Sequence, residues 1–376
     1  MFDVRNLATF HPMKSAACEL VRRVVETGIA PSCAVGFVAP NGTRVTAGGG
    51  EPPLAAGDVQ PEHALFDLAS VTKPMTALAV VESGLDPARP LVDFLPELGG
   101  TATAPISIEL LLAHRAGLRA TYPICAPLIA GGPNANVDRA RSLLTLANAR
   151  RPDAIGPCPR EGFPPLYSDA GYVLAGEALA RFVGARDAGE AIERLVAAPL
   201  GLGSTLGTAR GLASAGVDPI ARAAPTETVG WRGGTIRGRV HDETAWALTG
   251  DGGSGHAGMF GTVDAVLHFG ASVLARTDAP TWPAWVLRER PGGTLRAGFD
   301  GKSPEGSSAG TRIGPRAFGH LGFTGTSLWI DPDARVVLVL LTNRVHPTRD
   351  HVAIRAARPW IHDELFELAS SARGPS

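Results

Sequence analysis

The chain has 376 residues, of which 44% are hydrophobic and 19% charged, and it contains 46 glycines and 31 prolines. This composition is typical of a compact, loop-rich globular protein and argues against disorder, and the length allows two domains or one large domain with an insertion. The formal net charge of -1 gives no excess positive field for a phosphate backbone or an anionic membrane, so we expect neither nucleic acid nor membrane as a partner.

The N-terminal segment has no basic stretch followed by an apolar run and a small-residue cleavage site, so we expect a cytoplasmic protein without a secretory signal. The longest apolar run, 335–342, has the length of a strand and not that of a membrane span. The four cysteines show no C-x-x-C spacing. In a reducing compartment this distribution favours free thiols over disulfides or zinc ligands.

The N-terminal part of the chain predicts a helix followed by a hairpin. Residues 13–28 have helical apolar spacing, and the short apolar runs 33–40 and 43–49 are separated by Asn41-Gly42. An Asn-Gly pair between two such runs is a strong signal for a tight hairpin turn.

The middle of the chain, about residues 64–255, reads mostly as helices and loops. Gly117 and Gly184 stand where helices are expected to end, and Asp187 with Glu190 has the spacing of a capping box. The predicted helices cover 70–82, 107–116, 168–183 and 187–198.

The C-terminal part again predicts a hairpin, from 326–332 and 334–344, followed by a helix over 350–370 that is interrupted at Pro359. Strands and helix thus occur at both chain ends. We therefore predict an α+β fold in which both ends form one antiparallel sheet flanked by helices, and the mostly helical middle forms an inserted lobe.

The predicted sheet lobe comprises residues 1–63 and 255–376, and the helical lobe comprises 64–254. A cleft between two such lobes is where an active site is expected.

Ser70 and Lys73 in FDLASVTKPM carry the strongest chemical signal. Pro74 is tolerated only in the first turn of a helix, so this helix must begin near Ser70. The i, i+3 spacing brings Lys73 to the same face as Ser70, and the helix N-terminus favours developing negative charge. A serine hydroxyl is a weak nucleophile and needs such a base.

Lysine is rare in this chain, since Lys14, Lys73 and Lys302 are the only three among 35 basic residues. Arginine cannot give up its proton near neutral pH, whereas a desolvated lysine can, so lysine is expected where a base is needed. The alternative is a helix N-cap serine followed by a solvated lysine, which is a common arrangement.

Tyr167 precedes Ser168 and Asp169 at the start of another predicted helix. A tyrosine beside a lysine ammonium can share the proton transfer, and Asp169 can hold the lysine in place. The alternative is a packed aromatic residue before a serine or aspartate cap.

His320 opens a glycine-rich segment, GHLGFTGTSLWIDP, that leads into the C-terminal hairpin. Gly322 allows a ligand to approach the strand backbone closely. His320 is a candidate cation or hydrogen-bond donor toward substrate, and the N–H of Phe323 is a candidate oxyanion donor together with that of Ser70. The alternative is a purely structural histidine at a strand start.

Other polar residues carry weaker signals. His241-Asp242, His256 and His346 have no recognised metal-ligand spacing, so no metal site is predicted. Arg344 and Arg349 are candidates for contacting a substrate carboxylate, but solvated structural arginines are the favoured interpretation, and we leave them out of the site.

With S-x-x-K, Y-S-D and H-L-G in this order, the sequence resembles the serine beta-lactamase and penicillin-binding superfamily. More narrowly it resembles the class C-like branch of esterases, D-amino-acid-specific peptidases and carboxypeptidases. Recurring segments of that branch also match: LLLAHRAGL, RVHDETAWAL, GHAGMFGT and LLTNRVHP, so the resemblance covers about residues 20–360. It implies the fold predicted above and an acyl-enzyme mechanism without a cofactor.

The resemblance implies that Ser70 is the nucleophile, Lys73 the general base and Tyr167 the family's tyrosine. Asp169 stands where many relatives carry asparagine, and His320 stands where beta-lactamases carry lysine. The second change weakens the fixed positive charge for a substrate carboxylate and favours esters or neutral amides as substrates. The class A segment E-x-x-L-N is absent, so efficient beta-lactam hydrolysis is not expected.

The predicted function is therefore hydrolysis of a small-molecule ester, amide or D-amino-acid-containing substrate through an acyl-serine intermediate. One alternative is an acyltransferase, which shares the first half-reaction. Another is a binding or sensor module that has lost turnover, although such a module has no need of a base. The sequence leaves the natural substrate and the oligomeric state open.

Overall fold

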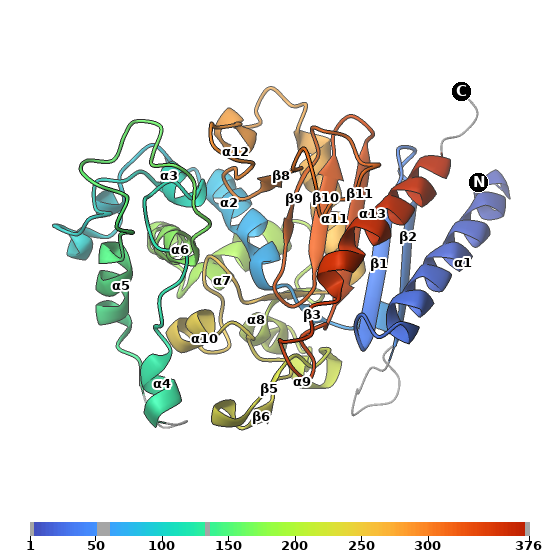
Figure 1. The fold of residues 1–376 in the computed structure, drawn as a ribbon, viewed down its shortest axis with the longest axis horizontal. Helices are drawn as coiled ribbons and strands as arrows, with labels where there is room; N and C mark the ends of the chain where they lie inside the picture. Colours follow the sequence, from blue (N-terminus) through green and yellow to red (C-terminus); the bar gives the residue numbers. More distant parts are fainter. Residues whose placement is uncertain (1–3, 51–60, 132–135, 373–376) are drawn as a thin grey trace.

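The computed structural model describes residues 4–50, 61–131 and 136–372 (Figure 1). Its helices are α1 (Val4–Glu26), α2 (Thr72–Ser83), α3 (Ile108–Leu112), α4 (Ala126–Gly131), α5 (Arg139–Asn148), α6 (Asp169–Val183), α7 (Ala188–Ile192), α8 (Ala209–Ser214), α9 (Pro219–Arg222), α10 (Glu243–Thr249), α11 (Val263–Arg276), α12 (Ala284–Leu287) and α13 (Ile354–Ser371). Its strands are β1 (Ser32–Val38), β2 (Arg44–Gly50), β3 (Phe66–Asp67), β4 (Leu206–Thr208), β5 (Thr228–Val229), β6 (Gly234–Thr235), β7 (Met259–Gly261), β8 (Asp300–Gly301), β9 (Phe318–Leu321), β10 (Ser327–Asp331) and β11 (Val336–Thr342). None of the helices within these ranges has the length and apolar character that crossing a membrane requires.

The largest sheet has six strands in the order β2-β1-β11-β10-β9-β8, and all of its pairings are antiparallel. Both predicted hairpins are present, as β1 with β2 and as β10 with β11. The two ends of the chain meet where β1 pairs with β11, with Val35 opposite Leu340. The prediction of one antiparallel sheet built from both chain ends is confirmed.

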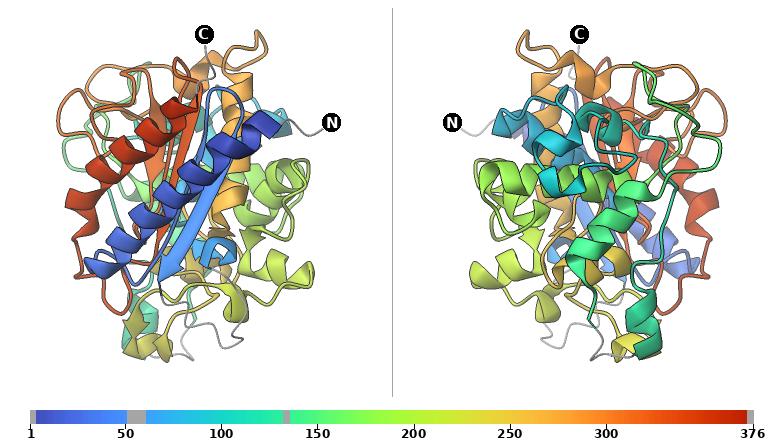
Figure 2. Two further views of the ribbon diagram at one scale, coloured as in Figure 1. Left: turned by 90° about the vertical axis from the view of Figure 1, so that its right-hand side faces the viewer. Right: turned by 90° about the vertical axis from the view of Figure 1, so that its left-hand side faces the viewer.

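Helices cover both faces of this sheet. The helices α1 and α13 lie side by side on the outer face, and α11 packs on the opposite face (Figures 1 and 2). Because both faces are covered, all seven residues of β11 are buried. Its side chains alternate: Val336 and Leu338 belong to the core beneath α1 and α13, whereas Val337 and Val339 belong to the core shared with α11.

A second sheet, not predicted from the sequence, has the order β3-β7-β4. Its strands have only two or three residues each, which is too short for a periodic pattern to be recognised. In this sheet Asp67 lies opposite Phe260. It joins the segment that leads to Ser70 to the segment that leads into α11, and so helps to position the candidate nucleophile.

The division into lobes 1–63 with 255–376 and 64–254 stays a prediction, and residues 1–3, 51–60, 132–135 and 373–376 of these ranges lie outside the described residues. One predicted detail is wrong, since α13 continues through Pro359 without interruption. The ring lies only six residues into the helix, where the loss of one N–H leaves most of the helical hydrogen bonds intact.

Candidate active site

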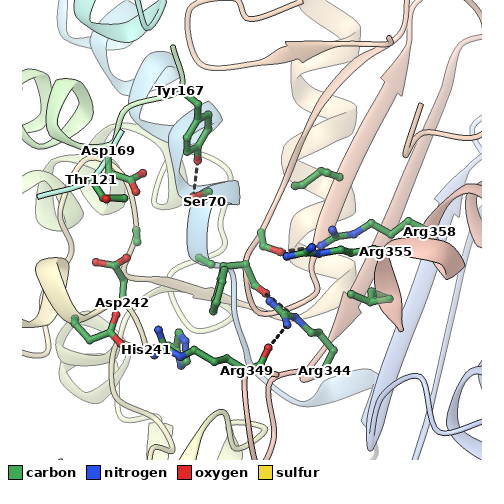
Figure 3. Close-up of a pocket in the computed structure, with 17 residues that line it drawn as sticks. Ser70, Thr121, Tyr167, Asp169, His241, Asp242, Arg344, Arg349, Arg355 and Arg358 are labelled. Carbon is green, nitrogen blue, oxygen red and sulfur yellow. Dashed lines mark hydrogen bonds and ion pairs between the residues drawn. The ribbon is translucent and has the colours of Figure 1, made fainter. Parts of the chain in front are cut away.

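Ser70 lies in a strained turn that precedes α2 (Figure 3). It belongs to a 3-10 turn over Ala69–Val71, and Ala69 has a φ of 46°, which residues other than glycine adopt only at an energetic cost. Asp67 stabilises the turn, because its Oδ1 accepts the Ala69 N–H at 2.8 Å. Pro74 lies in the first turn of α2, where no helical hydrogen bond is lost. The local sequence therefore places the Ser70 hydroxyl at the N-terminal end of a helix.

Asp67 also connects this turn to a second loop. Its Oδ2 accepts the His241 N–H at 2.8 Å. Burial raises the pKa of Asp67 to about 6, although the N–H donors of His241 and Ala69 act to lower it. Sequence reasoning gave Asp67 no role, because nothing in the chain order brings residue 241 next to the serine motif.

The Lys73 ammonium is buried and has an acceptor for each of its three protons. Nζ lies 2.8 Å from Ser70 Oγ, 2.8 Å from Asp169 Oδ1 and 3.2 Å from the His256 carbonyl oxygen. Burial acts to lower the pKa of Lys73, but the charge of Asp169 and the neighbouring Tyr167 oxygen act to raise it, and the balance lies above the ordinary lysine value. Lys73 is thus protonated in this arrangement, and it must lose a proton before it can accept one from Ser70.

The Tyr167 hydroxyl donates a hydrogen bond to Ser70 Oγ at 2.8 Å. Lys73 Nζ lies 4.8 Å from the centroid of the Tyr167 ring. Burial raises the pKa of Tyr167 above the ordinary phenol value, and the neighbouring Lys73 offsets this only in part. Ser70 Oγ therefore accepts hydrogen bonds from two protonated groups, the Lys73 ammonium in α2 and the Tyr167 hydroxyl just before α6.

His114 fixes the orientation of Tyr167. The two rings stack with centroids 4.6 Å apart and an interplanar angle of 28°, and His114 Nδ1 accepts the Ser168 N–H at 2.9 Å. Burial, and then the charge of Lys73, hold the pKa of His114 well below its usual range, so the ring is neutral. The segment LLLAHRAGL contains His114, but its positive φ of 59° and its contact with Tyr167 are tertiary features.

The turn after β9 is hydrogen-bonded to the segment that precedes Ser70. Thr324 Oγ1 donates to the Asp67 carbonyl at 2.7 Å, and Thr326 Oγ1 donates to the Leu68 carbonyl at 3.0 Å. A Cβ on Gly322 would lie 2.6 Å from the Leu68 carbonyl oxygen and would also clash with Thr326. Glycine is required here by the close approach of the Thr326 side chain and the Leu68 carbonyl, whereas the sequence predicted the approach of a ligand.

His320 lies on β9 beneath this turn and is 5% exposed. Its Nδ1 is 2.8 Å from the Leu321 carbonyl oxygen, and its ring centroid is 5.9 Å from that of Tyr167. Burial lowers the pKa of His320 to about 3, and Lys73 contributes to this shift. The imidazole is therefore neutral and packs behind Tyr167, and it is not among the residues that line the adjacent cavity.

A cavity of about 410 Å³ opens at Ser70 (Figure 3), a volume within the range that suits a small-molecule ligand. The structure brings the predicted site residues together. The cavity is lined by Ser70, Tyr167, Asp169, Gly322 and Phe323. Lys73 lies behind Ser70, and His320 lies behind Tyr167. Further lining residues that the sequence analysis did not place in the site include Thr121, His241, Asp242, Glu243, Arg355 and Arg358.

Arg344 and Arg349 also line the cavity, but protein groups occupy both guanidinium groups. Arg344 donates to the Phe323 carbonyl through Nε at 2.9 Å and through Nη2 at 2.7 Å. Arg349 forms ion pairs with Glu227 and Glu243. These contacts agree with a structural role for both arginines, but Arg344 is only 5% exposed and is not the solvated side chain that the sequence favoured.

Asp242 and His256 form a second polar pair near Lys73. His256 Nε2 lies 2.8 Å from Asp242 Oδ1, and the His256 backbone carbonyl is one of the three acceptors of Lys73. Burial acts to raise the pKa of Asp242, but His256 outweighs it and holds that pKa below the usual range. Within the described residues, no three His, Cys, Asp or Glu side chains come together as metal ligands.

Comparison with known proteins gives a family match over most of the chain. The family model described as Beta-lactamase matches residues 19–359. A Salmonella gallinarum protein named "Putative D-alanyl-D-alanine carboxypeptidase" is 29% identical over 265 residues, which cover 62% of this chain and 60% of that protein. The chain thus spans less than two thirds of the length of the curated relatives that it matches.

Two solved structures have the same fold. EstCE1, described as a hydrolase with promiscuous acyltransferase activity, superimposes with a TM-score of 0.69 at 19% identity and covers 96% of this chain and all of its own. A class C beta-lactamase from Rhodobacter sphaeroides has a TM-score of 0.64 at 19% identity and covers 93% of this chain and 99% of its own.

These comparisons confirm the α+β fold, and they confirm the resemblance that the three motifs suggested. The match to the family model extends over both strand-rich ends and the helical middle, and it includes every residue of the candidate site. The chain belongs to the beta-lactamase family.

Proposed function

We propose that this protein is a serine hydrolase that cleaves an ester or amide bond of a small molecule through an acyl-Ser70 intermediate. The observation that carries the proposal is the position of Ser70 Oγ, which lines the cavity and lies 2.8 Å from both Lys73 Nζ and the Tyr167 hydroxyl. A nucleophile needs a proton acceptor within hydrogen-bond reach, and this arrangement supplies two candidates.

The reactive form of the site contains one proton fewer than the resting form. Since Lys73 and Tyr167 are both protonated at rest, their hydrogen-bonded pair must release a proton before Ser70 can transfer its own. The two groups are coupled through Ser70, so the pair titrates as a unit. Ser70 Oγ then attacks the substrate carbonyl carbon while the pair takes the hydroxyl proton.

The pair next returns a proton to the leaving group, and the carbonyl re-forms as the acyl-Ser70 ester. In the second half-reaction the pair takes a proton from water, which attacks the acyl carbon. The bond between the acyl carbon and Ser70 Oγ then breaks, and the pair returns the proton to Ser70 Oγ. The backbone N–H groups of Ser70 and Phe323 stabilise the negative charge on the carbonyl oxygen in both steps. Asp169 keeps Lys73 beside Ser70 through its 2.8 Å contact.

The cavity and the relatives support a substrate class. Relatives named "Putative D-alanyl-D-alanine carboxypeptidase" and the neighbour EstCE1, described as a hydrolase, support small esters, amides and D-amino-acid derivatives. The family resemblance places a lysine at the position of His320, and the neutral, buried imidazole there supplies no fixed positive charge for a substrate carboxylate.

Acyl transfer to an alcohol or amine is the second candidate function. It is favoured by one observation, the likeness to EstCE1, which is described as having promiscuous acyltransferase activity. Both functions share the acyl-Ser70 intermediate and differ only in the acceptor.

The test is a panel of p-nitrophenyl esters, D-amino-acid amides and a chromogenic cephalosporin, assayed with the natural chain and with Ser70→Ala. We expect turnover of at least one ester or amide by the natural chain and loss of that turnover in Ser70→Ala. Adding a primary alcohol and quantifying the transfer product separates hydrolysis from acyl transfer. Full activity of Ser70→Ala would contradict the proposal.

A further inference from the structure

We propose that Arg358 is a positioning residue for the oxyanion site, because it holds the peptide group whose N–H belongs to Phe323. The inference rests on the proposed function, since the orientation of this N–H matters to catalysis only if acyl chemistry occurs at Ser70. Sequence reasoning gave Arg358 no role, because it lies 35 positions beyond Phe323 in the chain.

The contact that carries the inference is made by one nitrogen of Arg358. Nη2 donates to the Gly322 carbonyl at 2.8 Å and to the Thr326 carbonyl at 3.1 Å. In a trans peptide the C=O and the N–H point in opposite directions. A Gly322 carbonyl that is directed to Arg358 therefore directs the Phe323 N–H away from Arg358.

That direction leads toward the nucleophile. Arg358 and Ser70 lie on opposite sides of the cavity (Figure 3), and Gly322 and Phe323 line it. Among the hydrogen bonds of the described residues, none uses the Phe323 N–H as a donor. The N–H is thus left available for a ligand oxygen at Ser70.

Arg344 fixes the next peptide of the same turn. Its Nε and Nη2 donate to the Phe323 carbonyl, and its Nη1 donates to the Arg349 and His351 carbonyls, each at 2.8 Å. Guanidinium groups therefore hold both carbonyls that flank the Phe323 N–H. Such a double restraint limits rotation of the peptide group, which an oxyanion donor requires for preorganisation.

The burial of Arg358 supports a specific role. Arg358 is only 8% exposed, and no carboxylate of the described residues lies within ion-pair distance of its guanidinium group. Burial, and then the charges of Arg344 and Arg355, lower its pKa to about 10, so it remains charged at neutral pH. An unpaired buried cation is costly to the fold, and here its field favours negative charge on a nearby oxyanion.

A charged donor also alters the peptide that it contacts. A guanidinium hydrogen-bonded to the Gly322 carbonyl polarises the amide, and this strengthens the N–H of the same peptide as a donor. Arg358 therefore acts on the oxyanion through Phe323, in both orientation and donor strength, without touching the substrate.

Arg355 provides a matched control. It is also an arginine, it lies one turn before Arg358 on α13, and it lines the same cavity. Its side chain is exposed and forms no hydrogen bond or ion pair with the described residues. It therefore shares residue type, helix and neighbourhood with Arg358 but has no contact with the 322–326 turn.

The experiment compares Arg358→Met, Arg358→Lys and Arg355→Met with an uncharged p-nitrophenyl ester and with the corresponding thionoester. Sulfur is a weaker acceptor than oxygen, so the ratio of kcat/KM for ester over thionoester reports on the oxyanion donors. We expect Arg358→Met to lower kcat for the ester by about tenfold to a hundredfold, part of the loss that removing one oxyanion donor causes, with KM changed less than about threefold. The ester preference should fall with it, and Arg358→Lys should recover part of both. Arg355→Met changes a side chain that lines the cavity but does not contact the turn, so it should keep the ester preference whatever its effect on kcat and KM.

An unchanged ester preference in Arg358→Met would overturn the inference, because a loss of folded protein lowers both rates equally. If Arg358→Met does not fold, Arg358→Lys carries the same test. Failure of the proposed function is recognised separately, since Ser70→Ala would then remain active. An inactive Ser70→Ala together with an unchanged ester preference would overturn only the role of Arg358.

Discussion

Asp169 Oδ1 lies 2.8 Å from Lys73 Nζ, so a carboxylate stabilises the ammonium form of the residue that is expected to take part in proton transfer. The ion pair keeps Lys73 next to Ser70, but it also makes the deprotonated form of Lys73 harder to reach.

Asp169→Asn should therefore shift the pH dependence of kcat/KM to lower pH. Activity rises with pH as the Lys73–Tyr167 pair loses a proton. The asparagine amide removes the negative charge that raises the pKa of Lys73, so the effect of burial, which lowers this pKa, then dominates. Loss of one adjacent opposite charge shifts a pKa by about 1 unit or more. The measurement is the midpoint of the rising limb in both proteins, and a shift to higher pH would contradict the assignment.

Lys73→Arg should be nearly as inactive as Lys73→Ala, although it keeps the positive charge, because a guanidinium cannot serve as a base near neutral pH. The control is Lys302→Arg. Lys302 Nζ donates to the carbonyls of Thr311 and Ile313, contacts that an arginine can also make. The measurement is kcat of the three variants with one ester. If Lys73→Arg retained most of the activity, Lys73 would act through its charge alone.

Tyr167→Phe should lower kcat by about 10²-fold, within the range of general acid–base contributions, while KM and Tm change little. The phenyl ring keeps the stack on His114 and loses only the hydroxyl that contacts Ser70. Steady-state kinetics and a thermal melt on the same preparation test this. A kcat in Tyr167→Phe equal to that of the unsubstituted protein would assign the whole proton transfer to Lys73.

Asp67→Asn should change how stability depends on pH. Burial raises the pKa of the folded-state carboxyl to about 6 from its ordinary value of 3.8, so the folded protein binds the proton more tightly than the unfolded chain does. This contribution is fully present below about pH 4 and is lost as pH rises through about 6, and it amounts to at most ~3 kcal/mol.

Urea unfolding at pH 4.5 and pH 7 measures this effect in both proteins. The natural chain should lose more stability between the two pH values than Asp67→Asn does, because the amide does not titrate. The same fall in the free energy of unfolding for both proteins would show that Asp67 is not the buried acid responsible.

The sequence alone was sufficient to predict those contacts that local backbone geometry determines. Ser70 and Lys73 are three residues apart at a helix start, so their contact follows from helical spacing, and strand periodicity with an Asn-Gly turn was sufficient for the N-terminal hairpin. The meeting of Tyr167 with Ser70 was expected only from motif order, through the family resemblance.

Contacts between distant segments could not be predicted. His114 stacks on Tyr167 and Arg358 reaches Gly322 because of how the segments pack, and no periodic pattern encodes such pairings. The burial of His320 is of the same kind: a histidine at a strand start reads as an accessible donor, but Tyr167 packs over it. The same limit applies to Pro359, whose effect on α13 depends on how close it lies to the helix start.

The most direct test of this account is to treat the folded protein with a fluorophosphonate, digest it and locate the adduct by mass spectrometry. Ser70 is the serine whose hydroxyl contacts both Lys73 and Tyr167, so the account predicts one adduct, on Ser70, with loss of esterase activity in proportion to labelling. An adduct on another serine, or full activity after Ser70 is labelled, would contradict it.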